Sequence, residues 1–145
     1  MSGALKRAIA TRAAPQAIGP YAQGVAADGL VFLSGQIALD PERGRLVDGS
    51  IEDETRQVLA NLRAVLAADG LALDAIVRTT VYLTDLADFP RVNQAYAEFF
   101  TEPFPARATV QVAGLPRGAR VEIDAIALAS EAIASDIEEQ AVEKG

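Results

Sequence analysis

The sequence predicts an α+β fold, in which a mixed β-sheet carries two helices packed on one of its faces. Segments with the residue patterns of strands cluster near both ends of the chain, at 4–34 and 103–129, and one more lies at 75–84. Two segments with helical periodicity, 51–66 and 89–100, lie among them. The resulting order, βββαβαββ, is typical of α+β domains whose helices cover one face of the sheet. The second face is then left uncovered, which often marks an interface between subunits.

The length and the charge distribution indicate one domain followed by a tail. A chain of 145 residues fits a single domain, which we expect to occupy 1–129. In segment 130–145, five acidic residues and one lysine give −4 of the total net charge of −7. We expect this acidic tail to be a short frayed helix or disordered. The net charge argues against non-specific nucleic-acid binding, which depends on neutralising phosphates with Lys and Arg.

The residue types that are missing restrict the possible chemistry. The chain has no Cys, which excludes disulfides, thiolate nucleophiles and iron–sulfur sites, and no His, which removes the commonest general base and metal ligand. No Asp-rich loop has the spacing of a Mg²⁺ or Ca²⁺ site, so we expect neither a metal nor another cofactor.

The sequence also bears on location. No apolar run approaches the roughly 18–20 residues of a transmembrane helix, so we expect no membrane partner. We expect a cytoplasmic protein. Organellar import is the alternative, because residues 1–27 contain three basic residues and no acidic one.

The first predicted elements are short. Residues 4–12 have weak strand character, and the turn residues Gly19 and Pro20 precede Tyr21. From its chemistry alone, Tyr21 is interpreted as a turn aromatic that packs on the core.

A β-hairpin is predicted over 25–36, with its turn at Asp28 and Gly29. Its second strand ends at Ser34, and a serine at a strand end usually caps a backbone group. We do not interpret Ser34 as a nucleophile, because the chain has no His to activate it and no G-x-S-x-G motif surrounds it.

The first helix has the clearest pattern in the chain. Ser50 and Asp53 form a loose capping box at its start, and Gly70 ends it. Its apolar stripe has a period of 3.6 residues and consists of Ile51, Thr55, Val58, Leu59, Leu62, Val65 and Leu66. We expect this helix to lie across one face of the sheet and assign it no chemistry.

A strand and a second helix follow. Segment 75–84 is rich in β-branched and aromatic residues and is predicted to be a central strand. The helix over 89–100 has Pro90 in its first turn, where proline is tolerated, and aromatic residues along one side. Asn93 lies at the margin of that apolar side, where an asparagine is usually a partly exposed helix residue.

Segment 103–129 is predicted as two strands joined by a turn containing Gly and Pro, and therefore as a hairpin. On the first strand, Arg107 and Thr109 alternate with small apolar residues that we expect to face the core. Glu122 and Asp124 alternate with apolar residues on the second. The hairpin would place a guanidinium and carboxylates on one face of the sheet, as a possible carboxylate-binding and acid/base site. The alternative is a solvated face with cross-strand charge pairs, each worth roughly 0.2–1 kcal/mol.

The stretch PARATVQVAGLPRGARVEIDAIA within this segment contains a P-A-R strand, a short L-P turn and a V-E-I strand. This pattern resembles the C-terminal signature of the RidA family, also called YjgF/YER057c/UK114. G-P-Y at 19–21, S-G-Q at 34–36 and V-N-x-x-Y at 92–96 match the family as well, so the resemblance spans about Lys6 to Ala129. It implies a chorismate-mutase-like fold that assembles as a homotrimer around a central barrel, with ligand clefts between subunits.

The resemblance also implies an activity, that of a 2-iminobutanoate/2-iminopropanoate deaminase. Such an enzyme hydrolyses reactive enamines and imines, for example 2-aminoacrylate and 2-iminopropanoate, to a 2-oxo acid and ammonia. Arg107 could bind the substrate carboxylate through two N–H donors, and Glu122 is the candidate general acid/base. The implied pocket is further lined by Tyr21, Ser34, Asn93 and Thr109. No metal is needed, since an iminium carbon is already electrophilic.

One position departs from the commonest family pattern, and alternatives of other classes remain open. Many members have Cys where this chain has Thr109, so a mechanism that needs that thiol does not apply here. The first alternative is a non-catalytic trimer that binds small carboxylates as a sensor or acts as a chaperone-like protein, and the second is a ribonuclease. Glu122 favours the deaminase over a pure binder, which would need only Arg107. The acidic charge and the lack of His argue against a ribonuclease. A related deaminase in pyrimidine or aromatic-compound breakdown also remains open.

Overall fold

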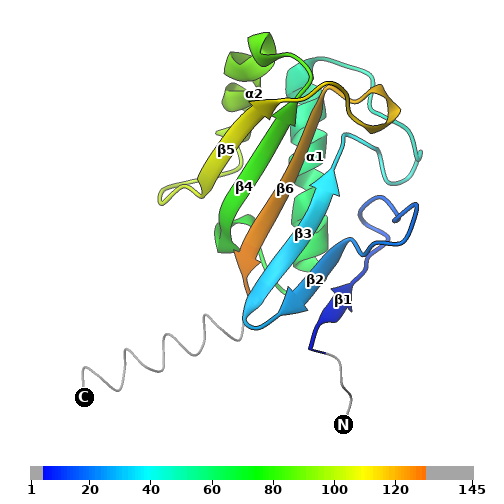
Figure 1. The fold of residues 1–145 in the computed structure, drawn as a ribbon, viewed down its shortest axis with the longest axis vertical. Coiled ribbons are helices and arrows are strands. Elements are labelled where there is room, and N and C mark those ends of the chain that lie inside the picture. Colours follow the sequence, from blue (N-terminus) through cyan, green and yellow to red (C-terminus); the bar gives the residue numbers. More distant parts are fainter. Residues whose placement is uncertain (1–4, 130–145) are drawn as a thin grey trace.

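The computed structural model describes residues 5–129, which form one six-stranded sheet with two α-helices on one of its faces (Figure 1). The strands are β1 (Arg7–Ile9), β2 (Gly24–Ala27), β3 (Leu30–Gln36), β4 (Ile76–Leu83), β5 (Ala106–Gln111) and β6 (Val121–Leu128), and the helices are α1 (Ile51–Ala67) and α2 (Phe89–Tyr96). The predicted α+β class, the mixed sheet and the element order are therefore confirmed. The predicted acidic tail, 130–145, lies outside the described residues.

Helix α1 supplies the helical side of the core, as its stripe predicts. All seven stripe residues are buried, and they pack against inward-facing residues of β3 and β6. Burying an aliphatic side chain of this size contributes about 1.5–3 kcal/mol. The capping box is complete, because the Asp53 backbone N–H donates to Ser50 Oγ at 3.1 Å and the Ser50 N–H donates to Asp53 Oδ2 at 3.2 Å.

Helix α2 is shorter than the sequence predicts, ending at Tyr96 rather than Phe100. Beyond Tyr96 the N–H groups of Glu98 and Phe99 bond to the carbonyls three residues back, so the chain continues as a tight turn. Phe100 is nonetheless buried, with its ring centroid 4.5 Å from that of Tyr96.

The hairpin predicted over 103–129 is wrong. The strand order is β1-β2-β3-β6-β4-β5, so β4 lies between β5 and β6. Strand β4 pairs with β5 in parallel and with β6 in antiparallel orientation. The physical reason is the connection: α2 carries the chain from β4 back to the start of β5, and a crossover of this kind makes neighbouring strands parallel. The hairpin predicted over 25–36 is confirmed, with positive φ at both turn residues, Asp28 and Gly29.

Strand β5 also faces the opposite way from the prediction. The side chain of Arg107 lies over aromatic rings of α2, on the helical side of the sheet. The small apolar residues that alternate with it therefore face the other side, where Val110 is 42% exposed. At this edge of the sheet the helical face is only partly covered, so polar side chains can occupy it.

Within residues 5–129, no helix covers the second face of the sheet (Figure 1). Phe32 on β3 is 43% exposed there, between the buried Val31 and Leu33. The sequence prediction of an uncovered second face is thus confirmed. None of the helices in the described part of the chain is long and apolar enough to span a membrane.

Candidate functional site

Glu122 lies on the uncovered face, at the point where β3 and β6 run side by side. Its neighbours Val121 and Ile123 are buried toward the helices, so the pleat turns Glu122 the other way. The pairing of β3 with β6 is irregular between Leu33 and Gln36. Gly35, in that irregular stretch, lies directly against the carboxylate of Glu122, and a side chain on Gly35 would overlap it. The absence of a side chain at Gly35 therefore makes the room that Glu122 occupies.

Tyr21 and Glu122 line the same cavity, of about 100 Å³. Its remaining walls are mostly apolar and come from four loops and strand ends: Pro15, Gln16, Ile18, Gly35, Gln36, Ile37, Leu39, Pro116 and Arg117. Tyr21 is 52% exposed, and its hydroxyl accepts a hydrogen bond from the Ile18 N–H at 3.3 Å. A carboxyl group and a phenol thus face one small, largely apolar space.

Burial in this cavity raises the pKa of Glu122 above the usual value of a glutamate, and the nearby carboxylate of Asp124 raises it further. Asp124 accepts a hydrogen bond from the hydroxyl of Tyr82 at 2.9 Å. The carboxyl group of Glu122 therefore keeps its proton to a higher pH than an ordinary glutamate, as a general acid requires.

Two buried amides that the sequence analysis did not identify hold the walls of this cavity. Asn61 on α1 is 1% exposed, and its Nδ2 donates to the carbonyls of Ile37 at 3.2 Å and Leu39 at 2.9 Å. Gln23 is also buried, and its Nε2 donates to the carbonyl of Pro15 at 2.7 Å. Asn61 interrupts the apolar face of the best-patterned helix, and that interruption was a usable signal.

Ser34 is near this cavity but does not line it. The strand continues to Gln36 and does not end at Ser34 as predicted, but the expected hydrogen bond to the backbone is present, because Ser34 Oγ donates to the carbonyl of Ala22 at 2.6 Å. The hydroxyl proton is thus committed to the chain, while the oxygen can still accept a hydrogen bond.

Arg107 lies on the helical side of the sheet. Its guanidinium carbon is 4.8 Å from the ring centroid of Tyr96 and 5.5 Å from that of Phe89. Across residues 5–129 the guanidinium makes no hydrogen bond or ion pair, although the side chain is exposed. An exposed guanidinium without a polar partner can bind a carboxylate with all of its N–H donors.

Asn93 and Thr109 accompany Arg107. Asn93 lies between Phe89 and Tyr96 on α2, four residues after one and three before the other, so all three share a helix face. Thr109 is two residues after Arg107 on β5 and points to the same side of the sheet.

The predicted site residues therefore fall into two sets: the Glu122 group (Tyr21, Ser34 and Glu122) and the Arg107 group (Asn93, Arg107 and Thr109). The expectation that Arg107 and Glu122 share a face of the sheet is wrong. Arg107 pairs with Thr79 of β4, and Glu122 pairs with Tyr82. Positions 79 and 82 differ by an odd number, so they and their partners point to opposite faces. A single copy of the chain brings the members of each group close together, but it does not bring the Arg107 group next to the Glu122 group.

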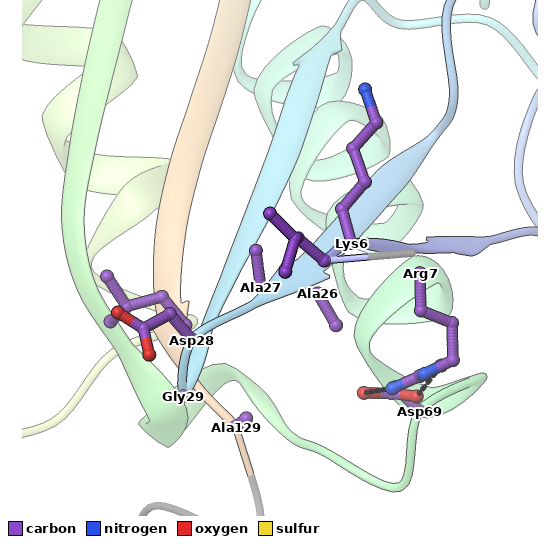
Figure 2. A pocket seen from close by; sticks show the side chains of 10 residues that line it. Lys6, Arg7, Ala26, Ala27, Asp28, Gly29, Asp69 and Ala129 are labelled. Carbon is purple, nitrogen blue, oxygen red and sulfur yellow. Dashed lines mark hydrogen bonds and ion pairs between the residues drawn. The ribbon is translucent and has the colours of Figure 1, made fainter. Parts of the chain in front are cut away.

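A second hollow lies at the other end of the sheet, beside the β2–β3 turn (Figure 2). It has a volume of about 240 Å³, and Arg7 and Asp69 form an ion pair of 2.8 Å beside it. None of the predicted site residues lines it. Among residues 5–129, no cluster of three or more acidic side chains has the arrangement of a metal site.

We predict that Gly35→Ala lowers kcat by at least tenfold, because the new methyl group displaces the carboxylate of Glu122 and misplaced catalytic groups cost rate steeply. Steady-state kinetics of the variant would show this. Gly44→Ala is a control, since a methyl group there meets no atom within 4 Å, although its positive φ makes it mildly strained. A Gly35→Ala variant with the activity of the control would mean that Glu122 is not needed where it lies.

The chain is similar in sequence and in fold to known proteins. A family model described as Endoribonuclease L-PSP matches residues 11–129. Human 2-iminobutanoate/2-iminopropanoate deaminase is 47% identical over 128 residues, covering 88% of this chain and 93% of that protein. The crystal structure of RidA from an Antarctic Psychrobacter superposes with a TM-score of 0.81 at 42% identity, covering 84% of this chain and 98% of that one. Escherichia coli TdcF with bound serine superposes with a TM-score of 0.81 at 43% identity, covering 86% and 99%.

Proposed function

The chain belongs to the RidA family, whose sequence model is described as Endoribonuclease L-PSP, and we propose that it hydrolyses reactive 2-enamino and 2-imino acids to 2-oxo acids and ammonia. The observation that carries this proposal is the pair of complementary groups. An arginine whose side chain has no polar partner within residues 5–129 and a carboxyl group of raised pKa match the two needs of such a substrate, whose carboxylate must be bound and whose nitrogen must be protonated. The 47% identity to a human deaminase of this class supports it.

The residues divide the reaction between them. Arg107 binds the carboxylate of the imino acid through two parallel N–H···O bonds, which a lysine could not reproduce. Glu122 donates a proton to the imine nitrogen, and a water molecule adds to the electrophilic carbon. Glu122 then takes a proton from the added water and returns it to the nitrogen. As the carbon–nitrogen bond breaks and ammonia leaves, Glu122 takes the remaining proton from the hydroxyl group. This step leaves the oxygen of the water as the 2-oxo group and restores the protonated form of Glu122.

The two groups meet when chains assemble. On opposite faces of one sheet they cannot contact the same small substrate, but the Arg107 group of one copy can face the Glu122 group of the next. A head-to-tail contact of this kind closes into a ring of three when each copy is rotated by a third of a turn from the last. We propose a homotrimer in which the uncovered sheet faces form a central barrel and each cleft between subunits holds one site. The exposed Phe32 and Val110 would be buried in that assembly.

A coupled assay tests the function. A serine dehydratase supplies 2-aminoacrylate, and the release of 2-oxo acid is followed with and without the protein. We expect faster release than spontaneous hydrolysis gives. If release is not accelerated and 2-oxobutanoate still binds, the protein is a carboxylate sensor. Cleavage of an RNA probe without imine hydrolysis would instead favour a ribonuclease.

The pH dependence gives a prediction for Glu122. A general acid works in its protonated form, so activity should fall as the pH rises through the pKa of Glu122. Because burial raises that pKa, this fall should occur at a higher pH than an ordinary glutamate would give. In Glu122→Gln the residual activity should lack this limb of the pH profile. A limb that persists unchanged in Glu122→Gln would assign the proton transfer to another group.

A further inference from the structure

The guanidinium of Arg107 is held by a closed set of contacts that the proposed chemistry does not use. Arg107 and Thr79 are directly paired across β5 and β4. The hydroxyl groups of Thr79 and Tyr96 lie 2.8 Å apart in a hydrogen bond, and the ring of Tyr96 contacts the guanidinium. The set thus joins β5 to β4 through the strand pairing, β4 to α2 through the hydrogen bond, and α2 back to β5 through the contact of Tyr96 with Arg107.

Each link in this set is firm. Thr79 is fully buried and Tyr96 is 6% exposed, so their hydrogen bond is shielded from water. Buried hydroxyl groups need such a partner, because one that is buried without a hydrogen bond destabilises the fold. The ring of Tyr96 is also packed against Phe100 on another side. The ring therefore has little freedom to move away from Arg107.

A free arginine side chain has many rotamers, and ordering it when a ligand binds costs conformational entropy that weakens the binding. A contact with an aromatic ring restricts the guanidinium but leaves its N–H donors without a protein acceptor. Such a residue is ordered before the ligand arrives and still unpaired, which is the condition for tight carboxylate binding.

We propose that Tyr96, anchored by Thr79, is a positioning residue that holds the guanidinium of Arg107 ready for the substrate carboxylate. The inference rests on the proposed function only for the identity of the ligand. Tyr96 itself touches no reacting atom. The ring of Phe89, which is also on α2, makes a second aromatic contact with the guanidinium.

Equilibrium binding tests this directly. Titration calorimetry with 2-oxobutanoate, a stable 2-oxo acid product, should show Tyr96→Leu binding about tenfold more weakly than the wild type. Thr79→Val should bind 2-oxobutanoate about threefold more weakly than the wild type. The loss is smaller because the ring of Tyr96 still contacts Arg107, although its hydroxyl has lost the hydrogen bond to Thr79. The uncharged analogue 2-oxobutanamide should bind to all variants with the same affinity. A general loss of structure would instead weaken the binding of both ligands.

Phe99→Leu is the matched control, because Phe99 lies under a different arginine, with the guanidinium carbon of Arg63 5.4 Å from its ring centroid. It should bind 2-oxobutanoate as the wild type does. Unchanged binding by a folded Tyr96→Leu would overturn the proposal, and so would a wild type that does not bind the carboxylate. If Tyr96→Leu does not fold, unchanged binding by Thr79→Val overturns it instead. Imine hydrolysis by the wild type, measured separately, decides the proposed function.

Discussion

Arg107→Ala should lower kcat/KM for 2-iminobutanoate by about two orders of magnitude while leaving the oligomeric state unchanged. The loss follows from removing the partner of a desolvated carboxylate, which costs about 3 kcal/mol. The assembly should survive because the side chain of Arg107 makes no hydrogen bond or ion pair within residues 5–129, so its removal leaves no polar side chain of these residues without a partner. Coupled kinetics and size-exclusion chromatography with light scattering measure the two quantities.

Two further variants sharpen this result. Arg107→Lys keeps the charge but loses the planar pair of donors, so it should recover only part of the activity. Arg63→Ala is the control, because Arg63 also stacks on an aromatic ring but lies in neither group. Dissociation of Arg107→Ala into monomers would mean that the arginine is structural, and its assigned role would then be wrong.

Mixing two impaired variants should restore activity above that of either variant alone. If each site takes Arg107 from one chain and Glu122 from the next, a mixed trimer of Arg107→Ala and Glu122→Gln chains contains one site with both residues intact. Random assortment of equal amounts should place an intact pair in roughly one quarter of all sites. The two proteins are unfolded, mixed and refolded, mixed assembly is verified by native mass spectrometry, and hydrolysis is then measured.

The control replaces the second partner by a chain carrying both substitutions, which can supply neither residue to an intact site. No activity should return in that mixture. Verified mixed trimers of the single variants that stay inactive would show that Arg107 and Glu122 do not act in one shared site.

The residues that follow one dominant periodicity were predictable from the sequence. The stripe of α1 recurs at every turn on one face of the helix, so the burial of its residues was predicted correctly. The capping box at the start of the helix was also predicted correctly. The hairpin over 103–129 was wrong because alternation shows which residues share a face but not which strand lies alongside. The helix between 75–84 and 106–111 was the neglected signal, since a strand, a helix and a second strand usually form a parallel pair.

Local sequence patterns could not predict that the Arg107 group and the Glu122 group lie on opposite faces of the sheet. Ala106, Ala108 and Val110 are small, and β5 lies at an edge where both faces are partly exposed, so apolar character did not mark the core side. The orientation of Arg107 depends on Phe89 and Tyr96, which lie on α2, the helix that precedes β5 in the sequence. Gly35, Asn61 and Thr79 have the same property: their roles come from neighbours distant in the chain.

The place of β6 in the sheet has a consequence for how the protein is made. This strand is the last one within residues 5–129, yet it lies in the middle of the sheet, between β3 and β4. While the chain is being translated, β3 and β4 each lack a partner on that side until residues 121–128 have left the ribosome. Unpaired edges of this kind can pair with other chains. The nascent chain therefore needs protection of these two edges until β6 has been made, and a chain truncated before residue 121 would lack the strand that joins β3 to β4.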